Sequence, residues 1–357
     1  MIDNFSLQVI LSIIFLSIIT FFGYLFSRRI LKENNLISLI PISVTFGCSL
    51  FIFLLHFISL VFGVHAATYI SIGVFILGII YISLSVKPQI LENPLNKRES
   101  IAIFSLSAFL FLLCLSYLIY FNTFDPLYHS AATLIKQKVY PPFNTYNSEL
   151  QGSYHYGLIL LASSLAIFSN IDVWNSFIPI QLLFIATVPL SIFSLVYFIK
   201  KSFNEAFFAT LIGCFCANLN SILFIKYLSN LIIHPDYHIY NKILGLADST
   251  FATNTCRSLV SPNMCLATQI SLVLFYLCIS FQFNKSSKNL IIKLFTIFIL
   301  SASFFFIYES FWVVPVIGSL LYHLPSVLNN QNRIQAIKTL ISLFVIFSIS
   351  PFITGGI

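Results

Sequence analysis

The chain has 357 residues, of which 58% are hydrophobic and only 8% are charged. A soluble domain carries about 25% charged residues, so this composition argues against a soluble enzyme, a disordered protein and a disulfide-rich secreted scaffold. The net charge of +7 comes from short basic groups between apolar runs, such as Arg28-Arg29, which argues against a nucleic-acid interface. The sequence therefore predicts an all-α polytopic membrane protein.

The apolar runs predict about 11–12 transmembrane helices. They cover residues 7–27, 36–62, 67–86, 101–121, 156–169, 174–199, 206–233, 266–283, 291–307, 311–324 and 336–355. No basic residues precede the first run, so we read it as an anchor and not as a cleaved signal peptide. We divide the chain into N-terminal transmembrane helices (1–100), a transmembrane core (101–324) and a C-terminal transmembrane helix (325–357).

Two polar segments, 122–155 and 234–265, are longer than the others. Basic residues in the other loops mark the cytoplasmic side, and counting spans from the loop at 87–100 puts 122–155 outside. The same count also puts Lys200-Lys201 outside, although basic residues are expected on the cytoplasmic side. The run 206–233 is either one span or two short helices broken near Asn218, and the second alternative puts 234–265 outside as well.

The segment 122–155 begins with Asp125, directly after an apolar span. Pro126 suits the first position of a helix, and residues 126–138 are expected to form a short amphipathic helix along the interface. Asp125 and His129 are four residues apart and share one face of that helix. Alternatively, Asp125 is only a helix cap and His129 an interfacial histidine.

The end of the segment is also distinctive. Pro141-Pro142 ends the predicted helix and sends the chain into an extended stretch. Tyr154-His155-Tyr156 then starts the next span, unless these aromatic residues only form an interfacial belt.

The order D-x-x-x-H, P-P-x-N and G-x-Y-H-Y-G resembles bacterial polytopic glycosyltransferases of the GT-C superfamily, of the family 39-like protein mannosyltransferase and aminoarabinose transferase type. The resemblance implies a GT-C-like fold with interfacial helices in a large extracytoplasmic loop. It also implies transfer of a sugar from a polyprenyl-phosphate donor to a glycan, lipid or protein acceptor. The chain departs from the family because three spans precede the Asp125 span and because Pro126 replaces the second residue of the usual acidic pair.

The resemblance implies that Asp125 is the general base that takes the acceptor's proton, with His129 beside it. The leaving phosphate needs cationic partners, and Arg257 suits it best because a guanidinium can bind phosphate oxygens in pairs. Further candidates for the phosphate are Lys242 and Lys136. Candidates for acceptor or substrate binding are Tyr154, His155, Tyr156, Asn144, Asp236, His238 and Glu309. Alternatively, Glu309 lies in the external turn between two spans.

Other chemistry stays open. His234, Asp236 and His238 alternate as metal ligands on a strand would, so a divalent metal is an option, but we assign neither a metal site nor a cofactor. Cys256 and Cys265 share the second polar segment and form a disulfide if it faces an oxidising space. No Walker loop occurs, which disfavours an ATP-driven pump.

Two other functions compete with the transferase. A transporter or flippase of a lipid-linked glycan predicts charges and broken helices near the membrane midplane. A non-catalytic membrane scaffold predicts that Asp125 is replaceable by Asn. For the transferase we expect a lipid-linked sugar and the bilayer as partners, no nucleic acid, and a bacterial cytoplasmic (inner) membrane with the active site facing outward.

Overall fold

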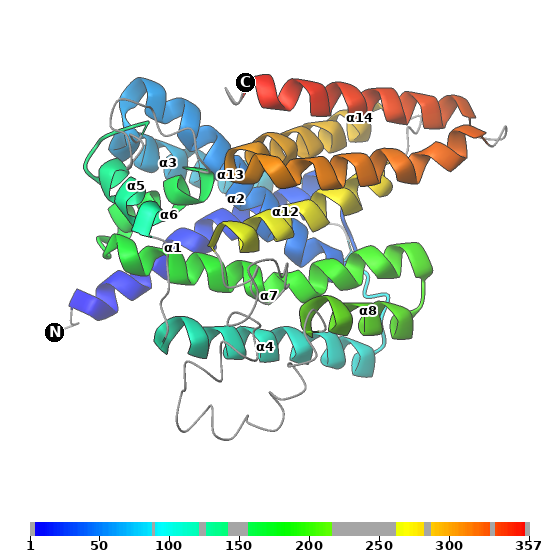
Figure 1. Cartoon of the computed structure of the whole chain (residues 1–357), viewed down its shortest axis with the longest axis horizontal. Helices are drawn as coiled ribbons and strands as arrows, with labels where there is room; N and C mark the ends of the chain where they lie inside the picture. Colours follow the sequence, from blue (N-terminus) through cyan, green and yellow to red (C-terminus); the bar gives the residue numbers. More distant parts are fainter. Residues whose placement is uncertain are drawn as a thin grey trace.

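The computed structural model describes residues 4–87, 90–120, 126–141, 156–215, 262–281, 287–328 and 333–353 (Figure 1). Within these ranges every regular element is a helix, and the β structure is one isolated bridge between Asn35 and Glu92. Six of the described helices are long and apolar enough to span a bilayer, and four shorter apolar helices accompany them. Large apolar side chains such as Leu84 and Phe344 face outward, as expected in lipid. The chain is an all-α polytopic membrane protein, as its composition predicts.

The structure describes the following helices in chain order. They are α1 (Asn4–Leu25) with its π-helical extension η1 (Phe26–Ile30), α2 (Leu36–Phe62), α3 (Val64–Ser85), α4 (Lys97–Tyr120), α5 (Pro126–Lys136), α6 (Tyr156–Ser169), α7 (Val173–Lys200), α8 (Phe203–Phe215), α12 (Pro262–Ile279), α13 (Ser287–Leu328) and α14 (Arg333–Ile353). The predicted span 206–233 therefore has a helix only to Phe215 among the described residues. The predicted break near Asn218 lies outside them.

Helices α1 and α2 cross in close backbone contact. Gly23 of α1 faces Ser43 of α2, and a Cβ atom at Gly23 would overlap the carbonyl group of Ser43. Gly47 of α2 has the same relation to the backbone of Ile19. Small residues at a crossing let two membrane helices approach in this way, so this pair forms a tight seam in the bundle.

Basic side chains gather at one end of the bundle, which we call the basic end. A buried apolar cluster at this end combines Ile37 from the start of α2, Ile103 from α4, Phe193 from α7 and Ala206 from α8. The basic end therefore contains the end of α1, the starts of α2 and α4, and the end of α7. The basic residues near it are Arg28, Arg29, Lys32, Lys97, Arg98, Lys200, Lys201, Lys293, Arg333 and Lys338.

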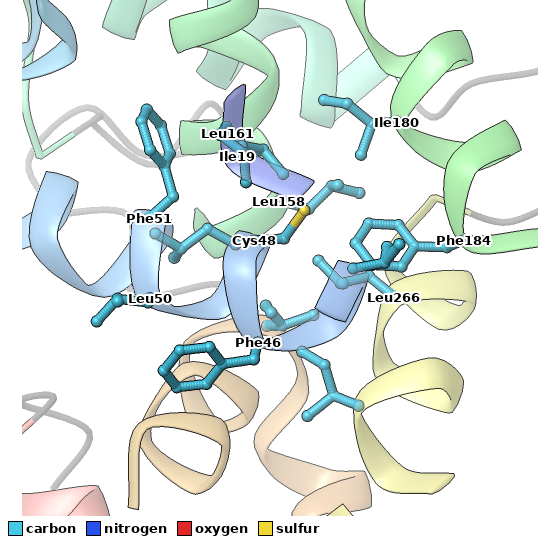
Figure 2. Close-up of a cluster of buried hydrophobic side chains, with 14 of the residues drawn as sticks. Ile19, Phe46, Cys48, Leu50, Phe51, Leu158, Leu161, Ile180, Phe184 and Leu266 are labelled. Atoms are coloured by element: carbon cyan, nitrogen blue, oxygen red, sulfur yellow. The ribbon is translucent and has the colours of Figure 1, made fainter. Parts of the chain in front are cut away.

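The short helix α6 corrects the predicted topology. Its first turn packs in the core, where Figure 2 shows Leu158 beside Cys48 of α2. Asn170, just beyond its last turn, accepts a hydrogen bond from Gln8 at the start of α1, 2.9 Å away. With 14 residues, or about 21 Å, α6 cannot cross the bilayer. The prediction that 156–169 is a full span is wrong. With one crossing fewer, Lys200-Lys201 lies at the same end as the other basic residues and no longer contradicts the positive-inside rule.

Helix α13 folds back on itself. The indole N–H of Trp312 donates to the hydroxyl of Ser301 over 2.8 Å, whereas eleven residues of straight helix would separate them by about 16 Å. Its halves, 289–307 and 312–328, run side by side next to α14 (Figure 1). Glu309 lies within this fold-back, and its side chain is outside the described part.

The core lies where α1, α2, α6, α7 and α12 meet. Figure 2 shows Cys48 of α2 between Phe51 on one side and Phe184 of α7 and Leu266 of α12 on the other, with Leu158 of α6 beside it. The neighbouring Cys265 is a free, buried thiol inside α12 and not a loop residue. The predicted disulfide between Cys265 and Cys256 is therefore wrong. Cys265 belongs to the helix that begins at Pro262 and not to the polar segment before it.

Candidate site at the α5 end

Helix α5 lies at the end of the bundle opposite the basic end, which we call the α5 end. Pro126 is its first residue, as predicted. Ala132 and Ile135 form its apolar face and are fully buried against the neighbouring helices. The carbonyl group of Ala132 also accepts a hydrogen bond from Ser163 of α6 over 3.2 Å. The predicted amphipathic helix is confirmed, and it packs on the bundle along its apolar side.

Lys136 fixes the last turn of α5. Its ammonium group donates to the carbonyl oxygen of Ile171, just before α7, over 2.9 Å. Its own carbonyl oxygen accepts from Nε2 of His65, at the start of α3, over 2.7 Å. This lysine was predicted to bind phosphate, and the structure shows that it joins three elements. An ammonium has three N–H donors, so the bond to Ile171 does not exhaust it.

His129 lies on an aromatic platform one turn from the start of α5. Its ring stacks on Trp174 of α7, with the ring centroids 3.3 Å apart and 28° between the planes. Phe177, one turn further along α7, presents its edge at 5.3 Å. The imidazole is buried, so the stack holds it in one orientation at the junction of α5 and α7.

A second polar pair, which sequence reasoning missed, lies beside this junction. Nδ1 of His56, in the last turns of α2, is 2.6 Å from the hydroxyl oxygen of Tyr140, a hydrogen-bond distance. The His56 ring also contacts Phe306 of α13, with centroids 4.5 Å apart. His56 lies inside the apolar run 36–62, so the sequence pattern gave no reason to select it as a site residue. Its position near the end of a span was the available signal.

The start of α6 and the fold-back of α13 meet next to this pair. A Cβ atom at Gly157 would lie 2.8 Å from Cγ1 of Ile307, so the absent side chain lets the helices approach. Tyr156 precedes Gly157, and Glu309 follows Ile307 by two residues. The backbones of these two predicted substrate-binding residues thus come near each other where α6 meets α13, whereas their side chains lie outside the described part.

The remaining predicted site residues lie outside the described residues. They are Asp125, Asn144, Tyr154, His155, Asp236, His238, Lys242 and Arg257. Of the predicted catalytic and phosphate-binding residues, the described part thus contains His129 and Lys136, seven positions and about two turns apart on α5.

Apart from Asp172, the described polar groups of the α5 end are neutral or cationic hydrogen-bonding groups. Histidine, tyrosine and lysine side chains can donate hydrogen bonds to an anionic ligand. A proton acceptor for an attacking hydroxyl is a carboxylate or a neutral imidazole, and Asp172 is the described acid at this end. Asp172 is exposed and precedes α7, with no side-chain hydrogen bond to the start of that helix.

Comparison with protein-family models, curated proteins and solved structures found no match to this chain. The membrane fold rests on the helices themselves. The family resemblance rests on the motif between residues 125 and 157.

Proposed function

We propose that this chain is a membrane glycosyltransferase that acts at its α5 end on a polyprenyl-phosphate-linked sugar. The acceptor oxygen or nitrogen attacks C1 of the sugar, the bond between C1 and the phosphate oxygen breaks, and polyprenyl phosphate leaves. Asp125 takes the acceptor's proton, as a positioned carboxylate base does. The cationic groups of the segment, Arg257 and Lys242 with Lys136, offset the charge on the leaving phosphate.

The observation that carries this proposal is the position of α5. The helix begins directly after Asp125 and is fixed to α3, α6 and α7 by the contacts of Lys136 and Ser163. We expect a base that adjoins such a fixed helix to be well positioned, which catalysis by a positioned group requires. His129 lies one turn further along the same helix.

The distribution of charge favours a transferase over a transporter or flippase. In the described helices, the Asp, Glu, Lys and Arg residues lie near helix ends or in the fold-back of α13. A transporter would be expected to carry charged or discontinuous sites near the midplane. Reaction at a membrane surface, where a lipid phosphate resides, needs no such site.

The membrane orientation follows from the basic end. Basic residues favour the cytoplasmic side, so the α5 end faces outward, in a bacterial inner membrane toward the periplasm or cell surface. In intact cells, a membrane-impermeant maleimide should label Lys138→Cys and spare Lys201→Cys, with both variants made in a cysteine-free background. The opposite pattern would overturn the outward orientation.

The activity is tested by mass spectrometry of lipid-linked and surface glycans in four strains: wild type, a deletion, Asp125→Asn and Asp172→Asn. We expect the deletion and Asp125→Asn to lose the same sugar and to accumulate its polyprenyl-phosphate form. Asp172→Asn is the matched control, because its exposed carboxylate lies at the same end, and it should behave as wild type. A glycan defect in the deletion together with a normal Asp125→Asn strain would contradict the proposal and favour a flippase or scaffold.

A further inference from the structure

A small polar cavity lies between α2, α7 and α12 at the basic end, away from the proposed active site. Its volume is about 10 Å³, close to the smallest space that admits one water molecule. Four hydroxyl-bearing residues line it, together with apolar residues of α2 and α12. The hydroxyl-bearing residues are Ser38, Ser191, Ser194 and Tyr276.

Two of these four hydroxyl groups already use their protons. Ser38 donates to Oε1 of Glu33 over 2.8 Å. Ser191 donates to the side-chain oxygen of Gln269 over 3.0 Å. Each hydroxyl has one proton and two lone pairs, so the oxygens of Tyr276 and Ser191 remain able to accept.

The hydroxyl of Ser194 is different. Ser194 is 6% exposed, and its oxygen has no hydrogen-bond partner among the described residues. Ser43 and Thr45, by comparison, donate to the carbonyl group four residues earlier in α2. A buried hydroxyl without a partner is costly. Its proton needs an acceptor, which a metal cation in the cavity would not supply.

We propose that the cavity is a binding site for one water molecule. The water accepts the proton of Ser194 and donates to Tyr276 and Ser191, which gives it the three hydrogen bonds typical of a buried water. It thereby joins α7 to α12 in a cavity that Ser38 of α2 also lines. The water completes a polar connection between α7 and α12 at the basic end.

The first test compares Ser194→Ala with Ser71→Ala in purified protein. Ser71 of α3 is the matched control, because its hydroxyl is also buried and has no partner among the described residues, and it does not line this cavity. We expect Ser194→Ala to lower Tm by about 2 °C and Ser71→Ala to leave it unchanged or slightly raised. Equal effects in the two variants would mean a dry cavity and would overturn the proposal.

The second test detects the water directly. Hydroxyl radicals generated by X-rays in isotopically labelled water modify side chains next to bound water. We expect Tyr276 to carry the label in wild type and to lose it in Ser194→Val, where the added methyl groups occupy the site. Phe281, fully buried in the apolar core, should stay unlabelled throughout. An unlabelled Tyr276 in wild type, or a Tm that rises with sodium but not potassium, would contradict a water site.

Discussion

The two ends of this bundle use polar residues in different ways. At the basic end, charged groups serve the fold: Arg29 donates to the carbonyl groups of Ile82, Ser83 and Val86 at the end of α3, and Lys200 lies 3.6 Å from Glu205. At the α5 end, histidine, tyrosine and lysine side chains join a short helix to its neighbours. The polar contacts of the basic end thus involve charged groups that close helix ends, whereas those of the α5 end attach α5 to the bundle.

Alanine at two close-packed glycines compares two helix contacts, the crossing of α1 and α2 near the basic end and the contact between α6 and α13, and should give the largest effects. Gly23→Ala places a Cβ against the backbone of α2, which cannot move aside, and we expect a loss of about 3 kcal/mol in unfolding free energy. Gly157→Ala meets side-chain atoms, Cγ1 of Ile307 at 2.8 Å and Cβ of Phe306 at 3.3 Å, and should cost less, about 1 kcal/mol. Thermal unfolding in detergent measures both.

Gly73→Ala is the control for these substitutions. A Cβ at Gly73 of α3 has no other atom within 4 Å, and alanine favours a helix over glycine. Its Tm should stay unchanged or rise. If Gly157→Ala is as damaging as Gly23→Ala, the contact between α6 and α13 is as tightly closed as the crossing of α1 and α2, and the comparison fails.

Lys136 tests whether the α5 end is held by its polar contacts. Lys136→Met keeps the aliphatic length but removes the donor to Ile171, and we expect a loss of about 2 kcal/mol because the bond is charge-assisted. Lys138→Met, an exposed position two residues later, should change stability by less than about 0.5 kcal/mol. Chemical denaturation of both variants measures the difference. Equal stability would mean that α5 is held by its apolar face alone.

The same pair of variants separates structure from binding. If Lys136 also binds the donor phosphate, Lys136→Met should raise KM for the lipid-linked sugar at temperatures where the protein stays folded. A normal KM in folded Lys136→Met would assign the lysine a structural role only.

His56 and Tyr140 provide a smaller and more local test. Their contact predicts a coupling of about 1 kcal/mol in a double-mutant cycle with His56→Phe and Tyr140→Phe. Unfolding free energies of the two single variants and the double variant give this value. A coupling near zero would mean that Tyr140 does not hold the chain after α5 against α2.

The sequence predicted the fold class and the position of α5, because both follow from local signals. Apolar runs predict the transmembrane spans, and Pro126 predicts the start of a helix. The topology around Lys200 was wrong because span length alone does not reveal that α6 begins inside the core. That feature depends on Leu158 packing against Cys48, a contact distant in sequence.

The candidate site was only partly predictable for a similar reason. His129 and Lys136 were identified because they lie in a polar segment with a helical spacing. His56, His65 and Trp174 were missed because each lies in or beside an apolar span. They become site residues only when α2, α3 and α7 bring them to α5.

The smallest expected effect lies at the basic end and has a distinctive sign. Burial raises the pKa of Glu33 above its ordinary value, while the hydrogen bond from Ser38 and the nearby Lys293 of α13 act in the opposite direction and are outweighed. Tyr276 of α12 also faces this carboxyl group. The folded state therefore holds the proton more tightly than the unfolded state. The contribution of Glu33 to stability is therefore highest below the ordinary glutamate pKa of about 4.3. It falls as the pH rises through the higher pKa of Glu33 in the folded protein.

Glu33→Gln removes this pH dependence while keeping an acceptor for Ser38. We expect the variant to have a Tm about 1 °C above wild type at neutral pH, with the difference shrinking as the pH falls toward 4.3. Glu92→Gln, an exposed position at the same end, should follow wild type at every pH. A difference between Glu33→Gln and wild type that grows toward acid pH would mean that Glu33 is stabilised in its charged form. Its carboxylate would then act as an ion-pair partner of the basic end and not as a protonated group within the hydroxyl network.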